Sequence, residues 1–267
     1  MLLGVHCDVR GGYLAALRRA ESLGCEAMQM LPCRRHHEPA QEEFSAFRRA
    51  FSESRVKRLV LHVRYAPFLA SEDRGRRESS IRNLSGEMRF GRSLGAGWLV
   101  MHLGAFSPGA TLERGLELFA EGVREASPGG PTLLVENVPG GGRRMGGSLE
   151  ELADALRRLE HRGVDARACI DTAHAWAYGY ELDSRDSMSL FLARVHHVLG
   201  TDIPVFHVND SGAERGSHRE DHARWGDGRV GSEALQTLLE REGHAVGILE
   251  APRGTDEENL AFVRRAV

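Results

Sequence analysis

Metal-binding side chains recur in this sequence at the points where apolar segments end. Six such segments between residues 58 and 250 each end in a histidine or an acidic residue. A lone histidine at such a position usually has a structural role, so the signal lies in the recurrence. Further candidates follow two of the segments. The full set is His62, His102, Glu136, Asp171, His174, His207, Glu220, Asp221, His222 and Glu250.

Carboxylates gathered in one place repel one another and are costly to bury, unless cations hold them together. A mixture of imidazoles and carboxylates suits zinc or manganese better than calcium or magnesium, which prefer oxygen ligands. The ligands are too many for one zinc ion, which takes about four. We therefore expect two or three ions, with Glu136 and Glu250 as carboxylates that bridge them. Metal ions about 3.5–4 Å apart activate water and stabilise the oxygens of a phosphoryl centre, so the predicted chemistry is phosphoester hydrolysis.

The apolar segments alternate with longer stretches of helical period, as in strand-then-helix units. One such stretch carries an apolar stripe from Leu112 to Val123, and Ser148–Glu151 has the pattern of a capping box that begins another helix. Eight units of this kind favour an α/β fold, a (β/α)₈ TIM barrel that forms a single domain over residues 1–267. The carboxyl ends of barrel strands share one face, where the metal-binding side chains should meet. The predicted strands are 2–7, 27–31, 58–63, 98–104, 132–138, 166–171, 205–210 and 245–252.

Composition limits the partners and the compartment. The net charge of −3 gives no overall basic field, so a nucleic acid would have to meet a local patch. The four cysteines form no CxxC pair, and we expect them to be buried and reduced. No segment has the length of a membrane span, and the N-terminus does not resemble a signal peptide. We therefore expect a cytoplasmic protein, and no obligate protein partner is evident.

A glycine-rich stretch, PGGGRRMGGS at residues 139–148, falls between a predicted strand and the following helix. It has two interpretations of about equal weight. It is either a flexible connection or a rim loop that brings Arg143 and Arg144 to an anionic ligand.

Several motifs, taken in order, make the chain similar to one known family. HVRY at 62–65, VMHLG at 100–104, LLVENVPGGG at 133–142, CIDTAHAWAYGYEL at 169–182, FHVNDS at 206–211 and LEAP at 249–252 resemble endonuclease IV. This family of xylose-isomerase-like barrels cuts DNA on the 5′ side of abasic sites. The resemblance covers essentially the whole chain.

The resemblance implies a ligand set for three zinc ions, with manganese possible at one site. His62 and His102 would hold the first ion, and Glu136 would bridge it to the second. Asp171, His207 and Glu250 would complete the second site. His174, His222 and Glu220 would hold the third.

The resemblance also implies roles in catalysis and in binding damaged double-stranded DNA. Glu136 and Glu250 are the expected catalytic residues. Tyr65 matches the aromatic residue that fills the gap left by a flipped nucleotide, a step that costs little where no base pair remains. The residues expected to contact DNA are Tyr65, Arg34, Arg35 and Arg143.

Four positions depart from the family pattern. Glu220 stands where the family has aspartate, so either Glu220 or Asp221 serves the third ion. Ala66 replaces a large apolar residue, Gly212 replaces a lysine, and the loop PCRRHHEP at 32–39 lacks the usual polar-aromatic run. Two alternatives therefore stay open, a sugar isomerase or epimerase with a single divalent metal on the same barrel, and a phosphoesterase that does not act on DNA.

Overall fold

The computed structural model describes residues 1–34, 37–64, 66–126, 129–199 and 203–266. Tyr65 and Arg35, two of the residues expected to contact DNA, lie outside these ranges. Eight parallel strands close into a barrel in the order β1-β10-β7-β6-β5-β4-β3-β2. They are β1 (Leu2–Cys7), β2 (Ala27–Met30), β3 (Arg58–His62), β4 (Trp98–His102), β5 (Thr132–Glu136), β6 (Ala166–Asp171), β7 (Val205–His207) and β10 (Val246–Leu249).

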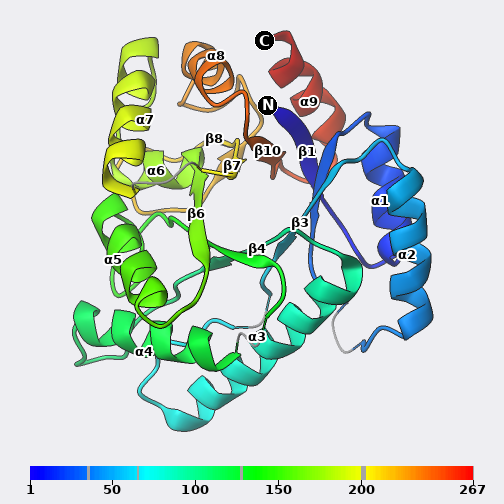
Figure 1. Cartoon of the computed structure of the whole chain (residues 1–267). Helices are drawn as coiled ribbons and strands as arrows, with labels where there is room; N and C mark the ends of the chain where they lie inside the picture. Colours follow the sequence, from blue (N-terminus) through cyan, green and yellow to red (C-terminus); the bar gives the residue numbers. More distant parts are fainter. Residues whose placement is uncertain (35–36, 65, 127–128, 200–202, 267) are drawn as a thin grey trace.

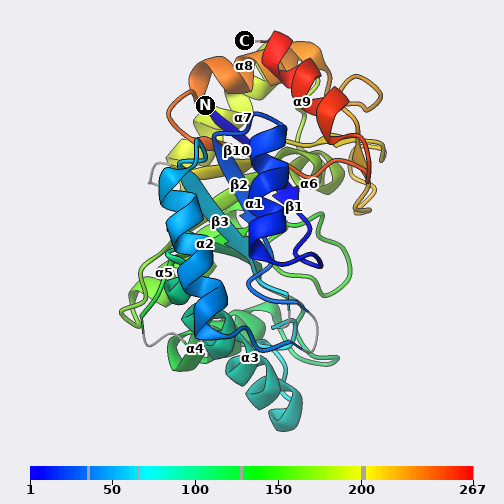
Figure 2. The ribbon, with the colours of Figure 1, turned by 90° about the vertical axis from the view of Figure 1, so that its right-hand side faces the viewer.

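Helices surround the strands on the outside of the barrel (Figure 1). Turned by 90°, the structure shows α1 and α2 lying alongside the strands that begin the chain (Figure 2). The helices are α1 (Tyr13–Ser22), α2 (Gln41–Glu53), α3 (Arg74–Leu94), α4 (Leu112–Ala126), α5 (Leu149–Glu160), α6 (Thr172–Tyr178), α7 (Arg185–Leu199), α8 (Ser232–Arg241) and α9 (Asp256–Arg265). The predicted (β/α)₈ barrel is therefore confirmed.

Two apolar layers hold the fold together. The larger layer lies between the strands and the helices, where the α4 side chains Leu116, Phe119 and Val123 are almost fully buried. The smaller layer fills the inside of the barrel with one or two side chains from each of seven strands. Its buried members are Ala27, Val60, Val100, Leu134, Cys169, Val205, Val246 and Ile248.

The structure differs from the predicted strands at two points that matter for the site. The segment 205–210 is not one strand, because β7 ends at His207 and a short strand β8 (Asp210–Ser211) follows it. β8 pairs antiparallel with β9 (His222–Ala223), outside the barrel. Glu250 lies just beyond the last residue of β10. Among the described residues, no helix is long and apolar enough to cross a membrane.

Candidate metal centre

The period of the strands places the candidate ligands at the mouth of the barrel. Side chains two residues apart on a strand point to the same face, so the residue two positions after a barrel-interior residue also points inward. Val60 is followed in this way by His62, Val100 by His102, and Leu134 by Glu136. The same step leads from Cys169 to Asp171, from Val205 to His207 and from Ile248 to Glu250. One layer of apolar side chains thus supports a layer of ligands.

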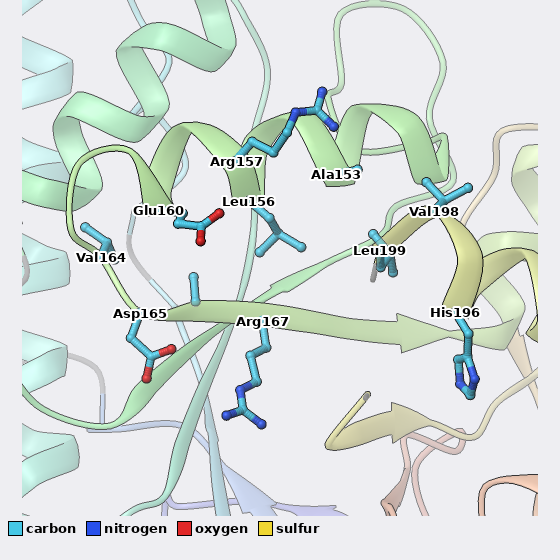
Figure 3. A pocket seen from close by; sticks show the side chains of 11 residues that line it. Ala153, Leu156, Arg157, Glu160, Val164, Asp165, Arg167, His196, Val198 and Leu199 are labelled. Carbon is cyan, nitrogen blue, oxygen red and sulfur yellow. The ribbon is translucent and has the colours of Figure 1, made fainter. Parts of the chain in front are cut away.

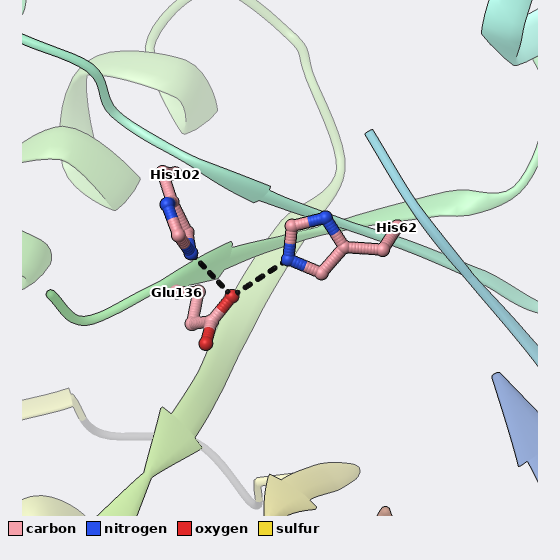
Figure 4. Close-up of side chains that lie close together, drawn as sticks. All are labelled: His62, His102 and Glu136. Carbon is pink, nitrogen blue, oxygen red and sulfur yellow. Dashed lines mark hydrogen bonds and ion pairs between the residues drawn. The ribbon is translucent and has the colours of Figure 1, made fainter. Parts of the chain in front are cut away.

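The first group of possible ligands is His62, His102 and Glu136, drawn in Figure 4. The Nε2 atoms of His62 and His102 lie 3.1 and 2.9 Å from the same carboxylate oxygen, Oε2 of Glu136. The other ring nitrogen of His62, Nδ1, donates to the Val63 carbonyl at 3.0 Å. Both rings therefore turn Nε2 toward the Glu136 carboxylate.

The second group is Glu136, Asp171, His207 and Glu250. His207 is fully buried, and its Nδ1 lies 2.8 Å from Oε1 of Glu136 and 3.4 Å from Oε2 of Glu250. Oδ2 of Asp171 lies 3.8 Å from the same nitrogen. Three carboxylates therefore surround one imidazole nitrogen.

The third group is Asp171, His174 and His222. In both histidines Nδ1 donates to a backbone carbonyl, that of Asn137 at 2.9 Å for His174 and that of Glu250 at 3.2 Å for His222. In both, Nε2 is buried and has no hydrogen-bond partner among the described residues. The two rings lie 5.3 Å apart between centroids. Buried polar atoms are normally satisfied, so two such nitrogens beside a carboxylate fit a bound cation.

Glu220, rather than Asp221, lies nearest this third group. Oε2 of Glu220 is 3.9 Å from Nε2 of His174. The neighbouring His174 imidazole outweighs partial burial and lowers the pKa of Glu220 to about 2. The carboxylate of Asp221 instead lies against Gly212, where a Cβ atom would be 2.9 Å from Oδ2 of Asp221. Of the two residues that the sequence left open, Glu220 is therefore the closer to the third group.

The carboxylates shared between groups differ from the expectation in one respect. Glu136 belongs to the first and second groups, as expected for a bridging residue. Asp171 belongs to the second and third groups, whereas Glu250 belongs to the second alone. The grouping thus favours Glu136 and Asp171 as shared carboxylates, whereas the bridging role expected for Glu250 stays a prediction. Asp171 ends a strand and also caps α6, accepting a hydrogen bond from the His174 amide at 2.8 Å, so it lies between two clusters.

In the ion-free site, protonated imidazoles balance the negative charges of the carboxylates. Burial alone would raise the pKa of Glu136, but the charges of His207 and His102 hold it well below its usual range. Burial would lower the pKa values of His174 and His207. Asp171 and Glu136 nevertheless raise the pKa of His174, and Cys169, Glu136 and Glu250 raise that of His207, well above the usual value. Glu136 therefore stays ionised and these two imidazoles carry protons. Metal ions would replace these protons, because protons and metal ions neutralise the same carboxylates.

Three buried amide side chains orient these ligands, and sequence reasoning did not assign them a role. Asn137 accepts from the Asp171 amide at 2.7 Å and donates to the Asp171 carbonyl at 3.0 Å. Asn209 donates to Oδ2 of Asp171 at 2.7 Å and accepts from the Glu250 amide at 2.8 Å. Gln29, which ends the inward-facing row of β2, contacts both His207 and Glu250. Asn137 and Asn209 directly follow or closely follow a ligand in the chain, which is a signal that could have identified them.

A buried aspartate fastens the loop that carries Glu220 and His222. Asp210 accepts hydrogen bonds from the backbone amides of Ser211, Gly226, Gly228 and Val230, at 2.8 to 3.3 Å. Trp225 is buried beneath the same loop and donates to the Val208 carbonyl at 3.0 Å. A single carboxylate therefore binds four backbone amides and holds this part of the chain in place.

The glycine-rich loop is a fastened rim loop, and its arginines contact protein. Arg143 donates to the Phe106 carbonyl, and Arg144 to the His218 carbonyl, each at 2.7 Å. Nδ1 of His218 in turn contacts the Pro139 carbonyl at 2.7 Å, so His218 joins two rim loops. Ser148 caps α5 as predicted, but the Glu151 carboxylate accepts from the amides of Gly146 and Gly147 and so holds the loop instead of closing a capping box.

A hollow of about 830 Å³ opens beside the second and third groups. Glu220, His222 and Glu250 line it, together with His6 and several arginines. One of them is Arg34, which pairs with Glu43 at 3.2 Å. The other arginines are Arg10, Arg19, Arg64 and Arg253. This volume is typical of a site for a small molecule or a flipped nucleotide.

A second hollow, of about 860 Å³, lies near the start of β6, between the ends of α5 and α7 (Figure 3). Arg157, Arg167 and His196 line it. Because strand starts face away from the mouth, this hollow is at the opposite face from the ligand groups.

The segment that follows β3 at the rim contains residues near the predicted DNA contact Tyr65. Ala66 is buried, so the residue after Tyr65 offers no apolar surface to a ligand. Phe68 in the same segment has a relative exposure of 44%, and the Arg76 guanidinium lies 5.5 Å from its ring centroid. Arg64 lines both the hollow beside the metal groups and a smaller hollow of about 450 Å³ formed with Phe68 and Arg76.

Comparison with known proteins gives consistent results. A family model described as xylose isomerase-like TIM barrel matches residues 17–266. A protein of Solibacter usitatus named probable endonuclease 4 is 35% identical, over 99% of this chain and 96% of its own length. The crystal structure of endonuclease IV from Thermus thermophilus superposes with a TM-score of 0.87 at 30% identity, covering 100% of this chain and 98% of that one. A D-tagatose 3-epimerase-like protein, at 16% identity, TM-score 0.76 and coverage of 100% and 97%, shares the fold.

Proposed function

Because the chain belongs to the endonuclease IV family of DNA-cleaving phosphodiester hydrolases, we propose that it cuts DNA on the 5′ side of abasic sites with three zinc ions. Manganese can replace zinc at one of the sites, since both accept imidazole and carboxylate ligands. The damaged strand would be repaired from the resulting nick.

One observation carries the proposal, the overlap of three ligand groups through Glu136 and Asp171. A single-ion site would need only one of these groups. The buried Nε2 atoms of His174 and His222, which have no hydrogen-bond partner among the described residues, support a cation in the third group as well. His62, His102 and Glu136 would hold the first ion. Asp171, His207 and Glu250 would hold the second with Glu136, and His174, His222 and Glu220 would hold the third.

Bound divalent ions supply a nucleophile at neutral pH and stabilise charge on a phosphoryl centre. The residues of the chain keep the carboxylates ionised and the imidazole nitrogens aimed at the centre, through the carbonyls of Val63, Asn137 and Glu250. A site that is already arranged before the substrate enters loses little energy in reorganising.

The substrate would enter from the hollow beside Glu220 and His222. Arg34 and Arg64 line this hollow and would meet phosphates of the DNA backbone. Tyr65, Arg35 and Arg143 remain proposed contacts. Phe68, exposed on the rim, would supply the apolar surface that Ala66 does not, because base–aromatic stacking is insensitive to sequence.

The experiment uses a duplex with a single abasic analogue. Purified protein loaded with zinc should cut the strand 5′ to the analogue, and removal of the metal by a chelator should stop the reaction until zinc is restored. His161→Gln, an exposed histidine at the end of α5, serves as the control that should keep full activity. An intact duplex in the presence of fully loaded protein would refute the proposal.

A matched pair of variants tests the contact from Phe68. The two large apolar side chains exposed among the described residues are Phe68 and Leu190, and Leu190 lies on α7. Phe68→Ala should weaken binding to the abasic duplex about tenfold, in line with about 1–3 kcal/mol for a stacked base. Leu190→Ala should leave binding unchanged. Equal affinities for the two variants would remove Phe68 from the interface.

A second candidate, a phosphoesterase that does not act on DNA, is favoured by the pairing of the arginines in the hollow. Arg10 lies 2.5 Å from Asp8, and Arg34 lies 3.2 Å from Glu43. Paired arginines attract a polyanion less strongly than free ones. Hydrolysis of a small phosphodiester, without a mobility shift of abasic or intact duplex, would favour this function over the first.

A further inference from the structure

Gln29 is a fully buried polar residue among the ligands, although it belongs to none of the three groups. It lies on β2, two residues after Ala27 in the barrel interior, and therefore points into the mouth. Its carbonyl oxygen is 2.8 Å from Nε2 of His207. Its amide nitrogen donates to Oε1 of Glu250 at 2.7 Å and lies 3.0 Å from Nδ1 of His6.

The partners of Gln29 fix the direction of its amide group. An ionised carboxylate can only accept hydrogen bonds, so Glu250 must face the NH₂ end of Gln29. The carbonyl end is then left for His207, and a carbonyl accepts, so Nε2 of His207 must carry a hydrogen. Gln29 therefore donates a hydrogen bond to Glu250 and accepts one from His207.

This arrangement matters because His207 is oriented differently from three other histidines of the centre. His62, His174 and His222 each give Nδ1 to a backbone carbonyl and turn Nε2 toward the centre. His207 turns Nδ1 toward Glu136, Glu250 and Asp171, and its Nε2 meets a side chain. A backbone carbonyl is present whatever the sequence, whereas this contact depends on residue 29.

We propose that Gln29 is a positioning residue that keeps the proton of neutral His207 on Nε2, leaving the Nδ1 lone pair for the metal, and holds Glu250 in place. The inference rests on the metal-binding part of the proposed function. Without Gln29, neutral His207 could place its proton on Nδ1, hydrogen-bonded to Glu136, and so block the second site. Contacts of this kind to a metal-binding histidine typically contribute 10- to 100-fold in metal affinity.

Two substitutions separate the two roles of Gln29. Gln29→Met keeps a long unbranched side chain but removes both the acceptor and the donor. Gln29→Glu keeps the size and can still accept from His207, but places a second carboxylate against Glu250. Met30→Leu, at the next and fully buried position of the same strand, is the control for disturbance of β2.

The measurements are zinc affinity by chelator competition and the ring tautomer of His207 in zinc-loaded, ¹⁵N-histidine-labelled protein. The His207 signals are assigned by their loss in His207→Asn. Gln29→Met should bind the zinc ion of the second group 10- to 100-fold less tightly and should lose the pure Nε2–H signature. Gln29→Glu should keep that signature but lose affinity, and Met30→Leu should match the wild type in both respects.

Unchanged zinc affinity and an unchanged His207 tautomer in Gln29→Met would overturn the proposal, and so would an equal loss of affinity in Met30→Leu. Neither measurement involves DNA. A wild-type protein that binds zinc but fails to cut abasic DNA would therefore count against the proposed function and not against this role of Gln29.

Discussion

The candidate metal centre has two parts, in which the buried charges have different kinds of partners. The strand-borne part, with His62, His102, Glu136 and His207, satisfies itself through short contacts between imidazoles and a shared carboxylate. The loop-borne part consists of Glu220 and His222 in the loop after β8, together with the neighbouring His174 of α6. It leaves two buried imidazole nitrogens without hydrogen-bond partners among the described residues. The charges of the first part thus have partners within the protein, whereas a cation would complete the second. Variants in the two parts should therefore affect stability and metal content differently.

Glu136→Gln should have the largest effect, because this fully buried carboxylate contacts His62, His102, His174 and His207. Removing one partner of a buried charge pair costs about 3–5 kcal/mol. We expect a loss of this order in the free energy of unfolding of the ion-free protein, measured by urea denaturation, together with loss of activity. If the free energy of unfolding of the ion-free variant equals that of the wild type, the contacts of this carboxylate do not stabilise the strand-borne part.

His222→Gln should have the opposite profile. Its Nε2 has no hydrogen-bond partner in the described part of the chain, so the ion-free protein should lose less than about 1 kcal/mol of stability. Metal analysis should give one zinc fewer per chain, and activity should fall about 100-fold or more. A stability loss equal to that of Glu136→Gln would abolish the distinction between the two parts.

Asp210→Asn tests how the loop-borne part is held. An amide can accept fewer of the four backbone hydrogen bonds that Asp210 receives, and a buried unsatisfied group costs about 1–3 kcal/mol. The loop that carries Glu220 and His222 should loosen, which would lower the affinity for the third zinc while the other two stay bound. Asp186→Asn, on the exposed first turn of α7, is the control. Equal loss of all three ions would contradict this local role.

The stability of the ion-free protein should also depend on pH in a way that zinc abolishes. Against the effect of burial, Asp171 and Glu136 raise the pKa of His174 above the usual value of 6.5, and Cys169, Glu136 and Glu250 raise that of His207. Groups with raised pKa values stabilise the fold fully below their unfolded pKa and lose that contribution as the pH rises through the folded value. Denaturation between pH 6 and 9 should therefore show falling stability without zinc. A flat profile would mean that these imidazoles are neutral in the ion-free fold.

The same contrast explains what the sequence could and could not predict. A strand has a period of two, so a ligand such as His102 after a buried Val100 identifies both the strand and its inward face. Loops carry no such period, and the sequence therefore left open whether Glu220 or Asp221 faces the third group. It also predicted one strand through 205–210, where the chain leaves the barrel after His207 to begin the loop. The role of Gln29 could not be predicted, because a single uncharged polar residue in an apolar run does not indicate a function.

The most direct test of the three-ion centre is the metal content of the purified protein. After saturation with zinc and exhaustive dialysis, elemental analysis against protein concentration should give three zinc ions per chain, and two for His222→Gln. A wild-type value of one ion per chain, unchanged in His222→Gln, would contradict the account and favour a single-metal site formed by Glu136, Asp171, His207 and Glu250.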